Sequence, residues 1–430
     1  MTETLFEKLA TFIAPFGVPT NSFQRSAYEK LLHLDFPTTK NEYWKYTRLN
    51  KISNSKFQIP NFSGTIKSVE DKKNSINKLS EVTKSEIFSS HYLVIENGIL
   101  REDLSQYENL FFSVTVLKNK SLEDHKLINT SIDQKNIFSA LNTAFFSESI
   151  IITFLPKSNI DEPLQLIFIS TGKNTISNPR ILIHAQKSSQ TKIAASYISL
   201  DSESSFTNSI TEFFIDENAT LVYDKIQNEN ASSFHISTEE VTQSKNSTFK
   251  LNTATLDGAL VRNNINISVN GENCETHMNG IVISKGNQHI DNHTFVNHKV
   301  ANCISNENYK YILEDRSTGV FNGRVIVQKD AQKINAYQKN ANILLSDFAQ
   351  IYSKPELEIY ADDVKCSHGS TTGQLDEDAV FYLQARGISK AKAKKLLVSA
   401  FISDIVKEFS SEGQRTKIAT VLREKHNWGN

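Results

Sequence analysis

A cysteine and a histidine two residues apart, Cys366 and His368, are the side chains of this sequence best suited to metal chemistry. In an extended strand, residues two apart point to the same face and lie about 6–7 Å apart along the chain. Thiolate and imidazole together suit iron, zinc or an iron–sulfur cluster. Such sites need about four ligands, and the sequence has no CxxC pair. Any metal or cluster held by this pair therefore needs ligands from another subunit.

A second group of metal-binding residue types occurs in the segment GNQHIDNHTFVNHKVANC, residues 286–303. It contains His289, His293, His298 and Cys303, and their spacing matches no known zinc pattern. In a strand, His289 and His293 share one face and His298 does not. The segment is either a metal site or the polar face of a strand.

A third interpretation makes Cys366 a catalytic nucleophile, with His368 as its base and Asp362 or Asp363 orienting the histidine. Side-by-side placement on one strand is poor geometry for proton transfer, because a catalytic cysteine usually faces a base from another element. The sequence also lacks G-x-x-x-x-G-K-[ST], G-x-S-x-G, H-E-x-x-H and G-x-G-x-x-G. We therefore expect no ATP to be bound through a Walker loop of this chain.

The sequence on either side of the pair predicts a junction between a sheet and a helix. Before it, Leu357, Ile359 and Ala361 alternate with polar residues, which is the period of a half-buried strand. After it, acidic residues 376–378 begin a helix that ends at Gly387, where both the helix dipole and the C-cap favour these residue types.

From about residue 148 the sequence consists of short apolar runs rich in β-branched residues and Phe, separated by Ser, Asn, Asp and Gly. Thr191, Thr220 and Thr248 recur about every 28–29 residues, and Cys274 follows about 26 further on. This period, without helical segments between the strands, favours stacked β-coils. A β-sandwich with similar strand spacing would look much the same.

We predict a mainly β chain with three regions: a helical and mixed N-terminal region over 1–147, a β-helix core over 148–373, and a C-terminal helical domain over 374–430. Residues 67–84 are polar and weakly periodic, which is typical of a mobile connector. In the segment KNEYWKYT, residues 40–47, the aromatic rings either anchor the N-terminal helices to the core or stack on a ligand.

Composition limits the class of protein. The 430 residues are 39% hydrophobic and 22% charged, with a net charge of −1, which is ordinary globular composition and indicates no nucleic-acid or membrane partner. The N-terminus has no basic region and no long apolar run, so a cytoplasmic location is expected. Three widely spaced cysteines do not fit a disulfide framework.

Two long segments carry a resemblance to a known family. They are YKYILEDRSTGVFNGRVIVQKDAQKINAYQKNANILLS and PELEIYADDVKCSHGSTTGQLDEDAVFYLQARGIS, residues 309–346 and 355–389. Both closely resemble the SufD branch of the SufB/SufD family, scaffold proteins of the SUF iron–sulfur cluster assembly system. The resemblance extends over about residues 20–410 and includes KNEYWKYT and GNQHIDNHTFVNH. A Glu-His-Glu element that SufB members carry is missing here.

The resemblance implies a right-handed parallel β-helix between two helical regions, in a scaffold subunit that is not an enzyme. It implies edge-to-edge pairing with SufB through the β-helix, and binding of the ATPase SufC through C-terminal helices 376–426. A transient iron–sulfur cluster would form at the SufB–SufD interface of this SufBCD complex, with a homodimer possible in isolation. The family's KCSHG motif corresponds to Cys366 and His368, and His368 is the stronger candidate for a cluster ligand.

Overall fold

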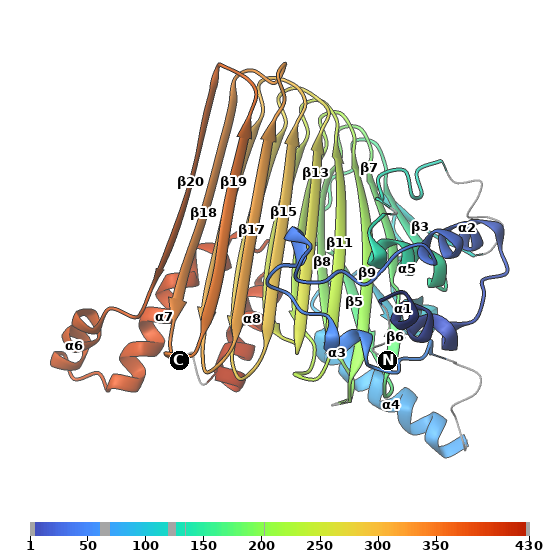
Figure 1. Ribbon diagram of the computed structural model, residues 1–430, viewed down its shortest axis with the longest axis horizontal. Coiled ribbons are helices and arrows are strands. Elements are labelled where there is room, and N and C mark those ends of the chain that lie inside the picture. The colour runs from blue at the N-terminus through green and yellow to red at the C-terminus, as the bar shows by residue number, and fades with distance from the viewer. Residues whose placement is uncertain (1–4, 61–68, 119–125, 134, 202, 427–430) are drawn as a thin grey trace.

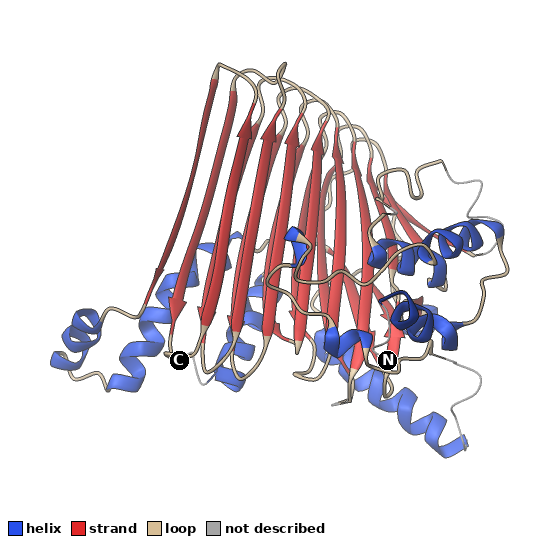
Figure 2. Cartoon of the chain, viewed as in Figure 1, coloured by secondary structure: helices blue, strands red, loops and turns tan. Residues whose placement is uncertain are grey.

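The chain forms a parallel β-solenoid of about eight turns with helices at both ends (Figures 1 and 2). The structure is a computed structural model and describes residues 5–60, 69–118, 126–133, 135–201 and 203–426. The prediction of a mainly β fold built from stacked coils is confirmed. Because successive coils pair in parallel, the antiparallel sandwich is excluded.

Two sheets make up the solenoid, and most successive strands alternate between them. In spatial order, the back sheet consists of β2 (Ile99–Leu100), β1 (Tyr92–Glu96), β5 (Leu164–Ser170), β8 (Gln190–Ser199), β10 (Thr220–Asn228), β12 (Thr248–Asp257), β14 (Glu275–Ser284), β16 (Ile304–Leu313), β18 (Ile334–Leu344) and β20 (Val364–Gly373). The front sheet consists of β19 (Gln350–Ile359), β17 (Thr318–Val327), β15 (His289–His298), β13 (Leu260–Val269), β11 (Phe234–Gln243), β9 (Ser205–Ile215), β7 (Arg180–Ala185), β4 (Ser149–Phe154) and β3 (Phe112–Leu117), with β6 (Thr175–Ser177) beside β9. Only β1–β2 and β3–β4 pair antiparallel among the named strands.

A residue in the left-handed conformation precedes each back-sheet strand from β8 to β18. These residues have φ between 57° and 62°, and they are Ser188, Asn218, Asn246, Asn273, Asn302 and Lys333. Asparagine tolerates this conformation better than most residues with a side chain. Asn246 Nδ2 donates to Asn218 Oδ1 at 2.9 Å, and Asn273 Nδ2 donates to Asn246 Oδ1 at 3.0 Å. An asparagine ladder therefore marks the repeat.

The strand register refines the threonine repeat read from the sequence. Thr220 lies beside Thr248, as the period predicts. Thr191, however, lies beside Leu221, one residue out of step.

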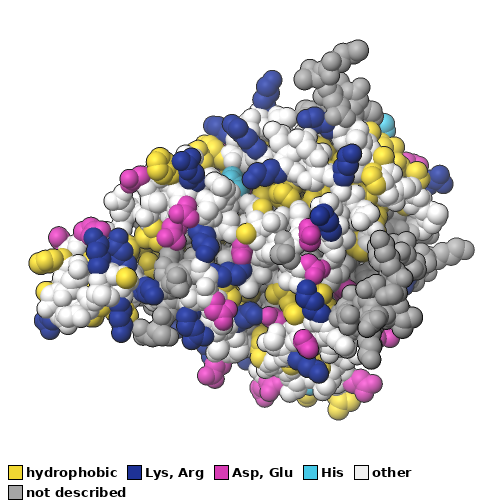
Figure 3. Space-filling view, turned by 90° about the horizontal axis from the view of Figure 1, so that it is seen from below, with side chains coloured by type: hydrophobic (Ala, Val, Ile, Leu, Met, Phe, Trp, Pro, Cys, Tyr) yellow, Lys and Arg dark blue, Asp and Glu magenta, His cyan; other side chains and the backbone are white. Residues whose placement is uncertain are grey.

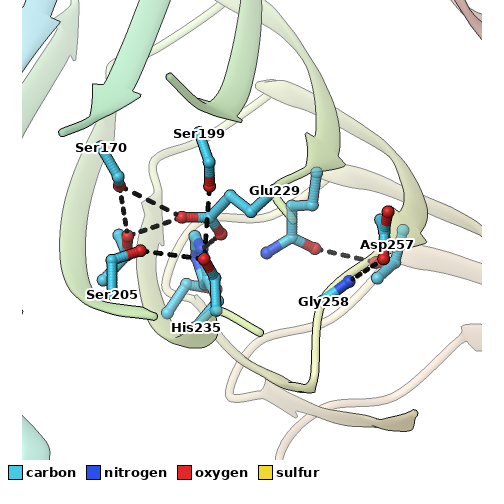
Figure 4. Close-up of polar contacts among 12 residues, drawn as sticks. Ser170, Ser199, Ser205, Glu229, His235, Asp257 and Gly258 are labelled. Atoms are coloured by element: carbon cyan, nitrogen blue, oxygen red, sulfur yellow. Dashed lines mark hydrogen bonds and ion pairs between the residues drawn. The ribbon is translucent and has the colours of Figure 1, made fainter. Parts of the chain in front are cut away.

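Alternate side chains of both sheets fill the interior, as the strand period requires. Most are apolar, and two pairs of buried charged or titratable groups illustrate how polar residues are accommodated. Lys225 Nζ lies 2.5 Å from Glu239 Oε1, and His235 Nδ1 lies 2.6 Å from Glu229 Oε2. Figure 4 shows the second pair, with the Ser170 hydroxyl 3.4 Å from Glu229 Oε1. Pairing offsets the cost of removing these charges from water.

N-terminal helices cover the outward face of the front sheet near its first strands (Figure 1). The elements are α1 (Leu5–Ile13), η1 (Ala14–Phe16), α2 (Ser22–Leu31), η2 (Glu42–Trp44), α3 (Asn50–Ser53) and α5 (Ile137–Phe145). The short helix η3 (Glu102–Leu104) lies instead at the back sheet, where Leu104 packs near Val94. Asn21 caps α2 by accepting the Gln24 amide at 2.8 Å, and Asn136 caps α5. Asparagine caps of this kind are local signals for a helix start.

The prediction of a mobile connector at residues 67–84 is wrong for residues 69–84, because α4 occupies Val69–Glu86. Residues 67 and 68 lie outside the described part of the chain. Leu79 is buried and packs with Val94 and Ile167 on the back sheet. A weakly periodic helix is stabilised here by tertiary packing.

The C-terminal helices are α6 (Glu377–Ala385), α7 (Lys390–Glu408) and α8 (Glu412–His426). Asp376 caps α6, and Ser389 caps α7. Apolar residues of α7, including Ile402, pack on outward residues of the back sheet such as Ile281. In the described part of the chain, no helix is both long and apolar enough to cross a membrane.

Candidate functional site

The solenoid ends in two strands that each have a sheet neighbour on one side only, β19 and β20. Pro355 in β19 suits an edge, because proline has no amide hydrogen for a central ladder. Residues 367–374, which include most of β20 and the residue after it, are all exposed. These two edges present unpaired backbone groups, which are a template for a strand of another chain.

Strand β20 carries Cys366 and His368 on the same face. Cys366 lies beside Ala336 of β18, and His368 lies beside Gln338. The Cys366 side chain is half-buried against the interior core, whereas His368 is exposed. The pair therefore sits at the open end of the solenoid, with its imidazole in reach of a neighbouring molecule.

The surroundings of Cys366 oppose the nucleophile interpretation. Burial raises the pKa of the Cys366 thiol, so the thiolate form that attacks electrophiles is disfavoured at neutral pH. Asp362 and Asp363 are exposed, and neither forms a hydrogen bond with His368 within the described residues. The third member of a catalytic triad is thus missing from this edge.

Two buried polar residues continue the row inward from His368. Gln338 of β18 lies beside His368, and Glu307 of β16 lies beside Gln338. Gln338 Nε2 donates to Glu307 Oε2 at 3.0 Å, and burial raises the pKa of Glu307 to about 7. The sequence analysis missed both residues. Extending the repeat through β16, β18 and β20 would have aligned them with His368.

Short hydrogen bonds hold the two edge strands together across the open end. The hydroxyl groups of Ser353 in β19 and Ser370 in β20 lie 2.8 Å apart. Ser353 also donates to Asn340 Oδ1 of β18 at 2.7 Å. The separation of the two edges is thereby fixed by the chain itself.

The second predicted group of residues does not form one site. His289 and His293 lie on the outward face of the front sheet, where His293 Nε2 is 3.0 Å from Asp291 Oδ1. His298 is buried and bonds Ser305 at 2.9 Å, and Cys303 is buried in the core. Across the described ranges, no three His, Cys, Asp or Glu side chains are placed to hold a metal ion.

The C-terminal tip carries an exposed apolar surface. Phe381 and Tyr382 of α6 are 71% and 57% exposed. Lys390 and Lys394 of α7 lie near Glu377 at 3.6 and 3.7 Å. Seen from below, apolar and basic side chains lie together at this tip (Figure 3). An exposed aromatic pair of this kind is typical of a protein-docking surface.

Comparison with known proteins gives a consistent family. A family model described as the SufBD core domain of SUF-system FeS cluster assembly matches residues 168–401. An iron–sulfur cluster assembly SufBD family protein of Synechocystis is 30% identical, over 89% of this chain and 86% of its own. Escherichia coli SufD is 27% identical, over 91% and 89%. The chloroplastic protein ABCI7 of Arabidopsis thaliana is 27% identical, over 91% and 83%.

The family model covers more than half of the chain, and its region contains β8 to β20 and the open end. The relatives in bacteria are named as assembly proteins. The chain therefore belongs to the SufBD family of iron–sulfur cluster assembly proteins.

Proposed function

We propose that this protein is a scaffold subunit, without ATPase activity of its own, on which an iron–sulfur cluster is assembled together with a second subunit. The observation that carries the proposal is the place of Cys366 and His368 on the exposed edge strand β20. The pair is an incomplete ligand set, because cluster sites need about four ligands. A partner strand added along β20 would bring the remaining ligands to it.

The partner in this proposal is SufB, paired edge to edge with β19 and β20. A transient cluster then forms at the SufB–SufD-type interface, with His368 as a ligand and Cys366 beside it. His368 is preferred because it is exposed, whereas Cys366 is half-buried with a raised thiol pKa. A homodimer through the same edges is the alternative assembly of the isolated chain.

The ATPase SufC binds the C-terminal helices, residues 376–426, in this proposal. The exposed Phe381 and Tyr382 of α6 supply an apolar anchor for it. Because α7 packs directly on the back sheet, movement of SufC on ATP binding would be transmitted to the solenoid. In the domain division that we propose, the β-helix core comprises residues 148–373. It lies between an N-terminal region, residues 1–147, and a C-terminal domain, residues 374–430.

Cluster loading of the complex tests the proposal. The chain is co-expressed with SufB and SufC, and iron and acid-labile sulfide are measured per purified complex. His368→Ala is expected to lower both by more than half without changing complex stoichiometry. The control is His33→Ala, which removes another exposed histidine far from β20. Equal loading of the His368→Ala and unsubstituted complexes would remove His368 from this role.

The isolated chain gives a second measurement. It is expected to retain little iron after purification, because its own ligand set is incomplete. Stoichiometric iron and sulfide on the isolated chain would show that no second subunit is needed to complete the site.

A further inference from the structure

A cavity of about 710 Å³ lies between the N-terminal region and the outward face of the front sheet. Strands β11, β13, β15 and β17 contribute its floor, and parts of residues 35–44 and 131–139 line its walls. In Figure 1 the dark blue segment that contains η2 crosses the front sheet here. Volumes of this size accommodate small organic molecules, and neither Cys366 nor His368 lines the cavity.

The wall formed by the KNEYWKYT segment is fixed to the sheet. Arg262 Nη1 of β13 donates to the Tyr43 carbonyl at 2.9 Å, and Arg324 Nη1 of β17 donates to the Tyr43 hydroxyl at 2.8 Å. The Arg262 guanidinium stacks 3.8 Å from the centre of the Trp44 ring. The aromatic residues of this segment thus anchor the N-terminal region, and they also form one side of a preformed cavity.

His293 presents a hydrogen-bond acceptor in the cavity wall. Burial would raise the pKa of Asp291, but Arg262 and the neighbouring histidines hold that pKa well below its usual range. Asp291 is therefore ionised and accepts the Nε2 hydrogen of His293 at 3.0 Å. Burial lowers the pKa of His293, so the ring is neutral at pH 7 and its Nδ1 keeps a free lone pair.

Two side chains of the cavity floor have no hydrogen-bond partner among the described residues. Thr238 of β11 and Asn322 of β17 are 3% and 7% exposed, and both line the cavity. Neither side chain forms a hydrogen bond with any residue that the structure describes. Because their polar atoms are not among the fully buried ones, a ligand or water in the cavity can form hydrogen bonds with them. Both positions are therefore available to a ligand that donates and accepts hydrogen bonds.

Charge in the cavity is largely neutralised. Arg262 is paired with Asp291, and Arg324 with Glu358. Burial raises the pKa of Glu240 to about 8, so this carboxyl group is mostly protonated at pH 7. The remaining charged groups, Asp35, Asp133 and Lys135, are exposed, and water screens them.

We propose that this cavity binds an uncharged ring compound that carries several hydroxyl groups, of the nucleoside or sugar class. Thr238, Asn322 and the His293 Nδ1 atom supply both donors and acceptors for hydroxyl groups. Tyr43 and Phe295 supply aromatic surface for the ring. A neutral ligand fits because the arginines in the wall already have carboxylate partners.

Titration of the full chain tests this proposal. The sequence has two tryptophans, Trp44 and Trp428, so Trp428→Phe leaves Trp44 as the sole indole reporter. Adenosine, maltose and adenosine monophosphate are titrated separately at pH 7, with calorimetry alongside fluorescence. If adenosine alone binds saturably, the ligand class is a nucleoside, and if maltose alone does, it is a sugar. If both bind, the cavity recognises the hydroxyl chemistry that the two compounds share. The monophosphate is expected to bind at least tenfold more weakly than adenosine wherever adenosine binds.

Substitutions in the floor locate the binding. Asn322→Leu and Thr238→Val are each expected to weaken binding at least tenfold. The matched control is Asn297→Leu, in the same sheet but outside the cavity, which should leave affinity unchanged. If Asn322→Leu fails to fold, the near-isosteric Thr238→Val carries the test. The proposal is overturned if neither neutral compound binds saturably, if the monophosphate binds as tightly as adenosine, or if the folded floor variants bind unchanged.

Discussion

At the scale of single residues, the carboxyl group of Glu307 shows how the interior of this solenoid responds to pH. Glu307 is buried, and its pKa is raised from 4.5 to about 7, chiefly by burial. Because the unfolded chain releases this proton at lower pH than the folded chain, stability is lost as pH rises between about 4.5 and 7. Above about pH 7, the folded chain carries the full free-energy cost of keeping an ionised carboxylate buried.

Glu307→Gln is expected to remove this cost, because the amide keeps the shape and cannot ionise. Relative to the unsubstituted chain, the variant should gain little at pH 4.5 and on the order of 3 kcal/mol at pH 8, from the difference between 4.5 and about 7. Urea denaturation at a series of pH values measures this. A difference that is constant with pH would show that Glu307 does not titrate in this window.

Residue types and spacing revealed Cys366 and His368, because their chemistry is readable from two neighbouring positions. They did not reveal Glu307 and Gln338, which reach His368 only through the strand register. Residue types and spacing also did not reveal that Asp291 orients His293. The role of a carboxylate depends on the face of the strand on which its side chain lies.

At the scale of elements, the turns before the back-sheet strands set the repeat. Asn246 combines a left-handed backbone with a place in the middle of the ladder, between Asn218 and Asn273. Helix starts with an Asn, Asp or Ser cap were predictable because capping is local. Helix α4 was not, because its packing partners Val94 and Ile167 lie in other elements.

Asn246→Ala and Asn246→Gly separate the two contributions. Alanine loses the ladder bonds and also strains the left-handed backbone, so it should cost roughly 2–3 kcal/mol of unfolding free energy. Glycine loses only the bonds and should cost about 1 kcal/mol less than alanine. The midpoints of thermal and urea unfolding show which of the two variants is the more stable. A glycine variant less stable than the alanine variant would contradict the conformational explanation.

At the scale of the whole molecule, the stacked coils could be predicted from the sequence repeat. The position of the N-terminal region on the front sheet could not. Arg262 and Tyr43, which join across the cavity, are 219 residues apart in the chain. No local pattern specifies such a contact. The aromatic segment was therefore predictable as an anchor, but its place on β13 and β17 was not.

The C-terminal tip allows a test of ATPase docking, which rests on the proposed function. Phe381→Asp is expected to weaken co-purification of SufC at least tenfold, because it puts a charge into a surface that must lose water on binding. Leu110→Asp is the control, since Leu110 is 89% exposed at a distant part of the chain. Retention of SufC by the Phe381→Asp variant, or equal loss in the control, would place the contact elsewhere.

The two ends of the solenoid differ in a way that limits its stoichiometry. At one end both terminal strands, β19 and β20, have ten residues and run parallel to their neighbours. At the other, β2 and β3 have two and six residues and run in reverse. Head-to-tail polymerisation needs matching surfaces at both ends. In the proposed edge-to-edge assembly, joining two long edges occupies both of them, and the short reversed strands at the far ends do not match them. Growth of that assembly would therefore end at a closed pair instead of a fibre.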